Sequence, residues 1–145
     1  MTTPSSLAKG AMAGLIGTAA MTAAQLAEMR MTGREPSLVP GHVAAKLLRL
    51  SPEDDQALSQ ISIRMHWAHG ITMGTVRALL GRAGLRGPGA AAAHFALMWS
   101  GDVMLYKSLG IATWPWQWSL QELAPDVLHK GIYATVTSAA YDTLA

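Results

Sequence analysis

The stretch GAMAGLIGTAAMTAAQLA, residues 10–27, contains no charged residue over eighteen consecutive positions. At a rise of about 1.5 Å per residue, a helix of this length nearly crosses a hydrocarbon core of about 30 Å, and residues 7–29 cross it fully. Residues at steps of three and four form one stripe along this helix: Gly10, Gly14, Gly17, Met21, Gln25 and Glu28. Small residues at this spacing let a second helix approach closely inside a membrane, so the stretch predicts a spanning helix in a bundle.

A cleaved signal peptide is the alternative interpretation of this segment, with alanine-rich cleavage candidates at residues 20–24. The segment is long for a signal peptide, and Lys9 is the one basic residue before it. We therefore expect the segment to be a membrane span of the protein.

The composition of the whole chain agrees with a membrane protein. Half of the 145 residues are hydrophobic, 14% are charged and the mean hydropathy is +0.22, whereas a typical soluble domain has about 25% charged residues. So low a charge excludes intrinsic disorder. With 14 Gly and a single Phe, the chain has the small residues that pack helix backbones closely.

Charge and cysteine content exclude several function classes. The net charge is +2 and the pI is about 9.2, but the eleven Lys and Arg residues are scattered and form no basic stripe. We therefore expect no nucleic-acid partner. The absence of cysteine excludes disulfides, thiolate metal sites and cysteine nucleophiles.

Breaks in the sequence predict four spanning segments within one domain, residues 1–145. Pro36, Pro40 and Gly41 begin a connector, and residues 41–50 are typical of a short amphipathic helix at a membrane surface. The sequence SPED, residues 51–54, has the composition of a helix start. Further apolar segments then follow, and the predicted spans are residues 7–29, 61–81, 89–109 and 126–144.

Three tryptophans lie between the third and fourth predicted spans, in the sequence WPWQW at residues 114–118. Tryptophan at the end of an apolar segment is typical of the aromatic belt at a membrane interface. A soluble surface loop is the alternative, but it would expose three indole rings to water. A second interfacial helix is predicted near residues 117–124.

Short sequence similarities suggest an internal duplication. GAMA at residues 10–13 resembles GAAA at residues 89–92, and HGI at residues 69–71 resembles HKGI at residues 129–132. Two helix-pair repeats in the same orientation would be related by an axis along the membrane normal.

Ionisable residues in the later segments predict a polar interior. A charged side chain at mid-membrane costs about 2.5–3.5 kcal/mol on insertion scales, so these residues should face inward and pair. With four spans, they form two clusters at different depths. The first cluster, on the side of the connector, comprises Glu28, His66, His69, Asp102, Tyr106 and His129. The second, on the opposite side, comprises Arg77, His94 and Asp142.

Three interpretations of these clusters remain open. They can hold helices together, with Arg64, Arg77 and Lys130 extending their charges to the membrane surface. They can form a path for protons or a small solute, because histidine changes charge near neutral pH. They can bind haem or a metal through a pair of histidines, the candidates being His66, His69, His94 and His129.

The sequence carries no recognisable catalytic motif. It contains no HExxH, GxSxG, Walker or GxGxxG pattern. We therefore do not expect an enzyme, although a missing motif does not exclude catalysis.

The histidine and glycine placements resemble those of a family. HWAHG at residues 66–70 and LHKGIY at residues 128–133 follow a glycine- and alanine-rich first segment. Together they are similar to small bacterial inner-membrane proteins of the YagU-like kind. The resemblance covers most of the chain loosely and implies an integral membrane bundle of about four helices. It supplies no catalytic residues.

The sequence as a whole predicts an all-α, four-helix transmembrane bundle in the inner (plasma) membrane. Its partner is the lipid bilayer, and a homo-oligomer or a larger membrane complex is compatible with it. A haem-binding membrane subunit for electron transfer and a soluble helical binding module are the alternatives. Lys and Arg are more numerous on the connector side, but most acidic residues lie there too, so orientation is left open.

Overall fold

The computed structural model describes residues 4–145, and that range is all-helical, with no strand. The helices are α1 (Ser6–Thr32), α2 (Val39–Leu48), α3 (Asp55–Arg82), α4 (Gly87–Ser108) and α5 (Leu120–Leu144), with a single 3-10 turn, η1 (Pro115–Gln117). The prediction of an all-α protein is confirmed. The four segments predicted as spans correspond to α1, α3, α4 and α5, and the helix predicted at residues 41–50 is α2.

Two predicted boundaries were wrong for identifiable reasons. The helix expected near residues 117–124 is the beginning of α5, because Ser119 and Glu122 form a reciprocal capping box that starts this helix at Leu120. Pro125, the sixth residue of α5, removes one backbone hydrogen bond without ending the helix. Similarly, α3 begins at Asp55 rather than Pro52, since the Asp54 side chain accepts a hydrogen bond from the Ala57 N–H at 2.8 Å.

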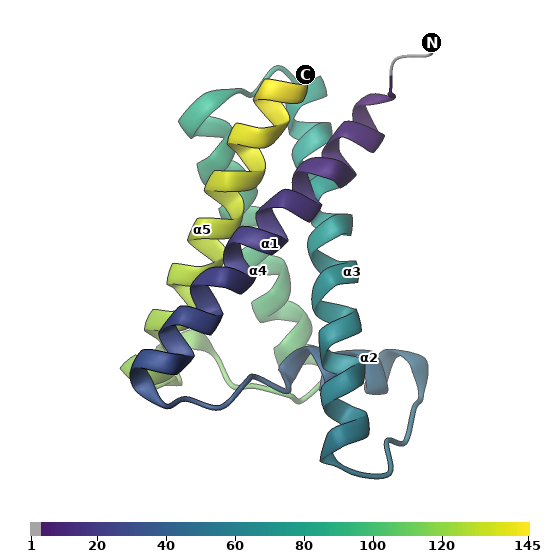
Figure 1. Cartoon of the computed structure of the whole chain (residues 1–145), viewed down its shortest axis with the longest axis vertical. Helices are drawn as coiled ribbons and strands as arrows, with labels where there is room; N and C mark the ends of the chain where they lie inside the picture. Colours follow the sequence, from purple (N-terminus) through teal and green to yellow (C-terminus); the bar gives the residue numbers. More distant parts are fainter. Residues whose placement is uncertain (1–3) are drawn as a thin grey trace.

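The four long helices run between two ends of the molecule (Figure 1). The first turn of α1, the C-terminal end of α5 and the α3–α4 turn lie at one end, whereas α2 and the α4–α5 connection lie at the other. Helix α1 packs against both α3 and α5, α4 packs mainly against α5, and α2 packs against α3. A duplication of the α1–α3 and α4–α5 pairs would make the α1–α5 contact equivalent to the α4–α3 contact. However, α1 packs closely against α5, whereas α4 contacts α3 only lightly, so the two pairs do not pack equivalently.

Glycines bring α1 and α3 into backbone contact. A Cβ atom on Gly74 would lie 2.1 Å from the Gly10 carbonyl oxygen and 2.7 Å from the Gly14 Cα. One on Gly14 would lie 2.5 Å from the Gly70 carbonyl oxygen. The glycine stripe predicted from the sequence is therefore the close-packing face of α1, and only glycine fits there.

Farther along α1, the same stripe of glycines faces α5 instead of α3. A Cβ atom on Gly17 would overlap the Thr137 side chain of α5, at 1.8 Å from its Oγ1. Gly10, Gly14, Gly17 and Met21 are all buried, whereas Gln25 and Glu28 farther along α1 are only partly buried. Helix α1 is thus wedged between α3 and α5 along its first half.

The buried side chains include large polar ones, and many large apolar side chains are exposed. The largest side chains with almost no exposure are Arg77, Tyr133 and His94. In contrast, large apolar side chains on the outside of the long helices expose about half of their surface: Leu15 47%, Ile16 46%, Ile63 59%, Leu79 52%, Leu97 51% and Met104 60%.

Among the described helices, α1 alone is long and apolar enough to cross a membrane by length and composition. Only 28% of its most apolar window is buried inside the structure. A signal sequence or the core helix of a soluble protein passes the same test, so the four-span arrangement stays a prediction.

Candidate functional site

One buried carboxylate connects three helices in the half of the bundle nearer α2. Asp102 of α4 is 4% exposed. Its Oδ1 lies 3.0 Å from Nε2 of His69 on α3, and its Oδ2 lies 3.1 Å from Nζ of Lys130 on α5. Both nitrogens therefore lie within ion-pair distance of the carboxylate, although His69 is charged only when it is protonated.

A second carboxylate shares the same lysine. Nζ of Lys130 lies 3.0 Å from Oδ1 of Asp126, one helical turn earlier on α5. The other oxygen of Asp126 accepts a hydrogen bond from the indole N–H of Trp99 at 2.9 Å. The Lys130 ammonium also lies 5.2 Å from the centre of the Tyr106 ring. We call these six residues the Asp102 cluster: His69, Trp99, Asp102, Tyr106, Asp126 and Lys130.

An arginine forms a second buried centre nearer the chain termini. Arg77 of α3 is fully buried, and its Nε donates to Ser138 Oγ at 3.0 Å. Its Nη2 donates to Oδ1 of Asp142 at 2.6 Å, and Oδ2 of Asp142 accepts from the Gly87 N–H at 2.9 Å. The guanidinium carbon lies 4.8 Å from the centre of the Tyr141 ring. Arg77, Ser138, Tyr141 and Asp142 are the Arg77 cluster, which links α3, α5 and the first residue of α4.

Two buried aromatic side chains lie between the clusters. His94 of α4 is fully buried, and its Nε2 lies 2.9 Å from the Met73 carbonyl oxygen. That nitrogen must carry the hydrogen, because a carbonyl oxygen can only accept. Tyr133 of α5 donates its hydroxyl to the Gly70 carbonyl oxygen, and its ring centre is 5.6 Å from that of His94. Four residues of α3 therefore make polar contacts with α4 or α5 over about 12 Å of helix: His69, Gly70, Met73 and Arg77. We call this row the polar file.

The structure gathers only some of the residues predicted for the first cluster. His69, Asp102 and Tyr106 meet, but His66 pairs with the Thr22 hydroxyl of α1 at 2.9 Å. Glu28 forms hydrogen bonds of 3.0 and 2.7 Å with Arg34 at the end of α1. His129 is 3% exposed, and its Nε2 has no hydrogen-bond partner among the described residues.

In the second cluster the predicted Arg77–Asp142 contact is present, but His94 does not join it and bonds to the α3 backbone instead. One of the three interpretations placed the charges of Lys130 and Arg77 at the membrane surface. The Lys130 side chain is instead 13% exposed and faces two carboxylates, and Arg77 is completely buried. Sequence reasoning missed Asp126 and Trp99. The spacing of Asp126 and Lys130, four residues apart on one helix, is the signal that could have found the pair.

The histidines do not share a space that fits haem. His66, His69 and His94 face three different partners, a hydroxyl, a carboxylate and a carbonyl. Neither of two grooves found along α5 is lined by a histidine. Within residues 4–145, no group of three or more His, Asp or Glu side chains is arranged to hold a metal ion. The haem hypothesis therefore stays a prediction without geometric support.

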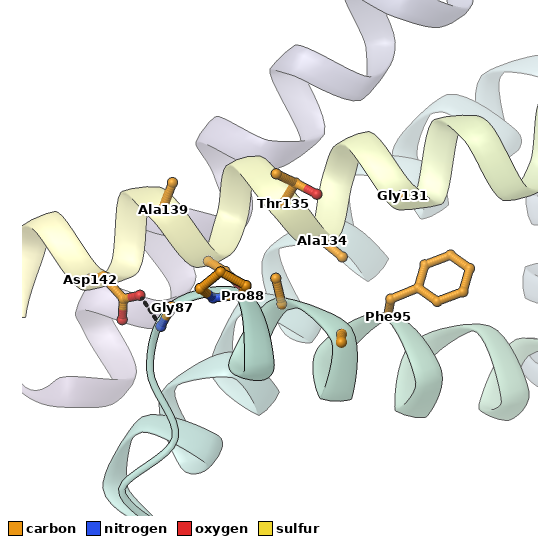
Figure 2. A pocket seen from close by; sticks show the side chains of 11 residues that line it. Gly87, Pro88, Phe95, Gly131, Ala134, Thr135, Ala139 and Asp142 are labelled. Carbon is orange, nitrogen blue, oxygen red and sulfur yellow. Dashed lines mark hydrogen bonds between the residues drawn. The ribbon is translucent and has the colours of Figure 1, made fainter.

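A shallow groove lies on the outer face of α4 and α5 (Figure 2). It encloses about 570 Å³ and is lined mainly by glycine and alanine, with Thr135 along it. Phe95 and Asp142 lie toward opposite ends, and Asp142 is held there by its bond to the Gly87 backbone. The groove has no titratable group other than this paired carboxylate, so it offers no chemistry of its own.

Comparisons of the chain with protein-family models, with curated proteins and with solved structures found no match.

Proposed function

We propose that the protein is a four-span integral membrane protein and that its polar file is a path for protons through the bundle. The burial pattern supports this proposal most strongly. A fully buried arginine and histidine lie in the interior, while many leucine, isoleucine and methionine side chains lie on the outside of the long helices. In water-soluble proteins arginine is almost never fully buried unless it is paired.

The way the helices associate supports the same conclusion. In lipid no hydrophobic force drives helices together, so they associate through close backbone packing and polar contacts. Four glycines make the closest α1–α3 contacts, and ion pairs cross between α3, α4 and α5. Met21, Met98 and Tyr133 pack together beside these contacts.

The end of the bundle that contains α2 has the properties of a membrane interface. Leu47 and Leu48 of α2 are 51% and 67% exposed, beside Lys46 and Arg49. Trp116 is 77% exposed and stacks on Trp114 at 5.2 Å. We propose that these groups lie in the headgroup region of the bilayer, as interfacial helices and aromatic belts do. The similarity to YagU-like proteins would place them in a bacterial inner membrane.

Membrane insertion is tested by expressing the full chain and separating membranes from the supernatant. We expect the protein in the membrane fraction after an alkaline wash, with release only by detergent. A monomer in the detergent-free supernatant would contradict the proposal and favour a soluble helical module.

Proton conduction is tested in liposomes that contain a pH-sensitive dye. We expect wild-type protein to dissipate an imposed pH gradient faster than empty vesicles, and Asp102→Asn to reduce this rate at least about tenfold. Asp55→Asn is the matched control, because Asp55 is exposed at the start of α3. Equal rates in wild-type, Asp102→Asn and empty vesicles would leave the polar file with a structural role only.

A haem-binding subunit is the alternative from the sequence. It predicts a Soret band in protein purified after haem supplementation, and absence of the band would remove it.

A further inference from the structure

The Asp102 cluster contains one more carboxylate than fixed cation. Asp102 and Asp126 are both in contact with the ammonium of Lys130, which is the only lysine or arginine among the six cluster residues. With His69 neutral, two negative charges and one positive charge leave the cluster at −1. The Arg77 cluster has no such excess, because one guanidinium faces one carboxylate.

The groups around the cluster do not supply the missing charge. On α3, His66 is held by Thr22 of α1. On α5, His129 lies close to Asp126 but also to Glu28 of α1 and its partner Arg34, which pair with each other. Tyr106 on α4 is neutral as a phenol. The remaining site for a positive charge is the imidazole of His69 itself.

Burial makes such an excess charge unfavourable. The side chains of Asp102 and Lys130 are only 5% and 13% exposed, and an uncompensated charge in a low-dielectric interior is costly. His69 is the most exposed member of its pair with Asp102, at 35% against 5%. His69 is therefore the more accessible of the two groups to an incoming proton.

We propose that the Asp102 cluster is a binding site for one exchangeable proton, carried by His69. Nε2 of His69 lies 3.0 Å from a carboxylate oxygen and carries a hydrogen, since two lone pairs would repel at that distance. The incoming proton leaves a hydronium ion and forms an N–H bond at Nδ1, and the cluster changes from −1 to neutral. This inference rests on the proposed proton path and names the first group on it.

Trp99 provides a built-in reporter of the site. Its indole N–H donates to Asp126, which shares Lys130 with Asp102. A change of charge on His69 alters the field that this indole experiences, and indole fluorescence responds to that field. The other four tryptophans, at positions 67, 114, 116 and 118, lie outside the cluster and can be replaced by Phe.

The experiment is a fluorescence titration from pH 8 to pH 5 of the full chain in detergent micelles, with Trp99 as the single tryptophan. We expect one transition in the range where imidazole changes charge, and we expect His69→Gln to abolish it. Glutamine keeps a donor toward Asp102, so the bundle should remain folded. His42→Gln is the matched control, because His42 is exposed on α2, and it should leave the transition unchanged.

Proton uptake by the unmodified protein is the second measurement, needed because replacing four tryptophans can itself disturb folding. Between pH 8 and pH 5, wild type should take up about one proton more than His69→Gln. A transition that persists in His69→Gln, or equal uptake by wild type and His69→Gln, would overturn the proposal. So would a transition that follows sodium concentration at constant pH, which would make the ligand a metal cation.

The outcomes separate this inference from the proposed function. If His69→Gln loses the transition and wild type shows no proton flux in liposomes, the proton-binding site is supported and the proton path is contradicted. Flux that is unchanged in His69→Gln would keep the path and remove His69 from it.

Discussion

The α1–α3 interface and the α3–α4–α5 interior hold the same bundle together by different means. Between α1 and α3, four glycines bring two backbones into contact and no charge is present. Between α3, α4 and α5, five charged or titratable side chains pair across the helices. The first interface leaves no room for an added atom, while the second depends on which charges lie opposite one another. The comparison shows that backbone proximity and charge pairing both hold helices together in this bundle, beside a small apolar core.

Loss of Asp142 should be the most damaging single change. Asp142→Ala leaves the fully buried Arg77 without its carboxylate, which we expect to lower the free energy of unfolding by about 3–5 kcal/mol. Thermal unfolding in micelles measures the effect. Glu53→Ala, at an exposed position in the loop before α3, is the control and should change nothing measurable.

The same pair can be tested for coupling. Arg77→Met combined with Asp142→Ala should be less destabilised than Asp142→Ala alone, because the unmatched charge is gone. If the two losses simply add, the charges do not depend on each other.

The glycine interface should be nearly as sensitive. Gly74→Ala places a methyl group 2.1 Å from the Gly10 carbonyl oxygen, so the helices must separate. We expect a loss of about 1–3 kcal/mol in unfolding free energy. Gly131→Ala is the matched control, because nothing lies within 4 Å of its Cβ position, and its helix propensity should make it neutral or stabilising by up to about 1 kcal/mol. Equal behaviour of the two variants would show that the α1–α3 contact is not tight.

The hydrogen bond between Thr22 and His66 should have a smaller effect. Thr22→Val keeps the shape of the side chain but removes the hydroxyl that lies 2.9 Å from His66 Nε2. We expect a destabilisation of about 1 kcal/mol, measured by the same unfolding assay. Thr143→Val is a suitable control, because its hydroxyl bonds only to the backbone of its own helix. A loss no larger than that of the control would mean that this bond contributes nothing between helices.

The smallest effect concerns the start of α5, outside both interfaces. The backbone N–H and the hydroxyl of Ser119 hold the pKa of Glu122 below its ordinary value of 4.5. The ionised carboxylate therefore stabilises the helix start above pH 4.5, and this contribution is lost as pH falls through the lowered pKa. The protection of the Leu123 amide against hydrogen exchange, relative to its intrinsic rate, should fall below that pH in wild type and show no such step in Glu122→Gln. A step of the same size in both proteins would assign it to another group.

The two interfaces also differ in how far the sequence predicted them. Gly10, Gly14 and Gly17 could be placed on one face because helical periodicity depends only on spacing. The ion pairs were harder, since spacing does not determine which helix lies opposite. Arg77 and Asp142 were matched correctly, but Lys130 was assigned to the surface although it lies between two carboxylates. His94 was grouped with charges, yet it bonds to a backbone carbonyl, a partner that leaves no trace in the sequence.

Helix boundaries failed where local capping decided them. Ser119 and Glu122 start α5 six residues before the apolar segment begins, and the capping pattern was present in the sequence. Hydropathy alone placed the start at residue 126 because the first turns of α5 are polar.

The central claim of this account is that lipid surrounds the outward-facing apolar side chains. Because the chain has no native cysteine, single nitroxide labels can be attached at Ile16, Leu97 and Glu53 in protein reconstituted into liposomes. Labels at Ile16 and Leu97 should collide readily with oxygen and rarely with a water-soluble nickel chelate, while the label at Glu53 shows the opposite preference. Free access of the nickel chelate to all three labels would contradict a membrane-spanning bundle.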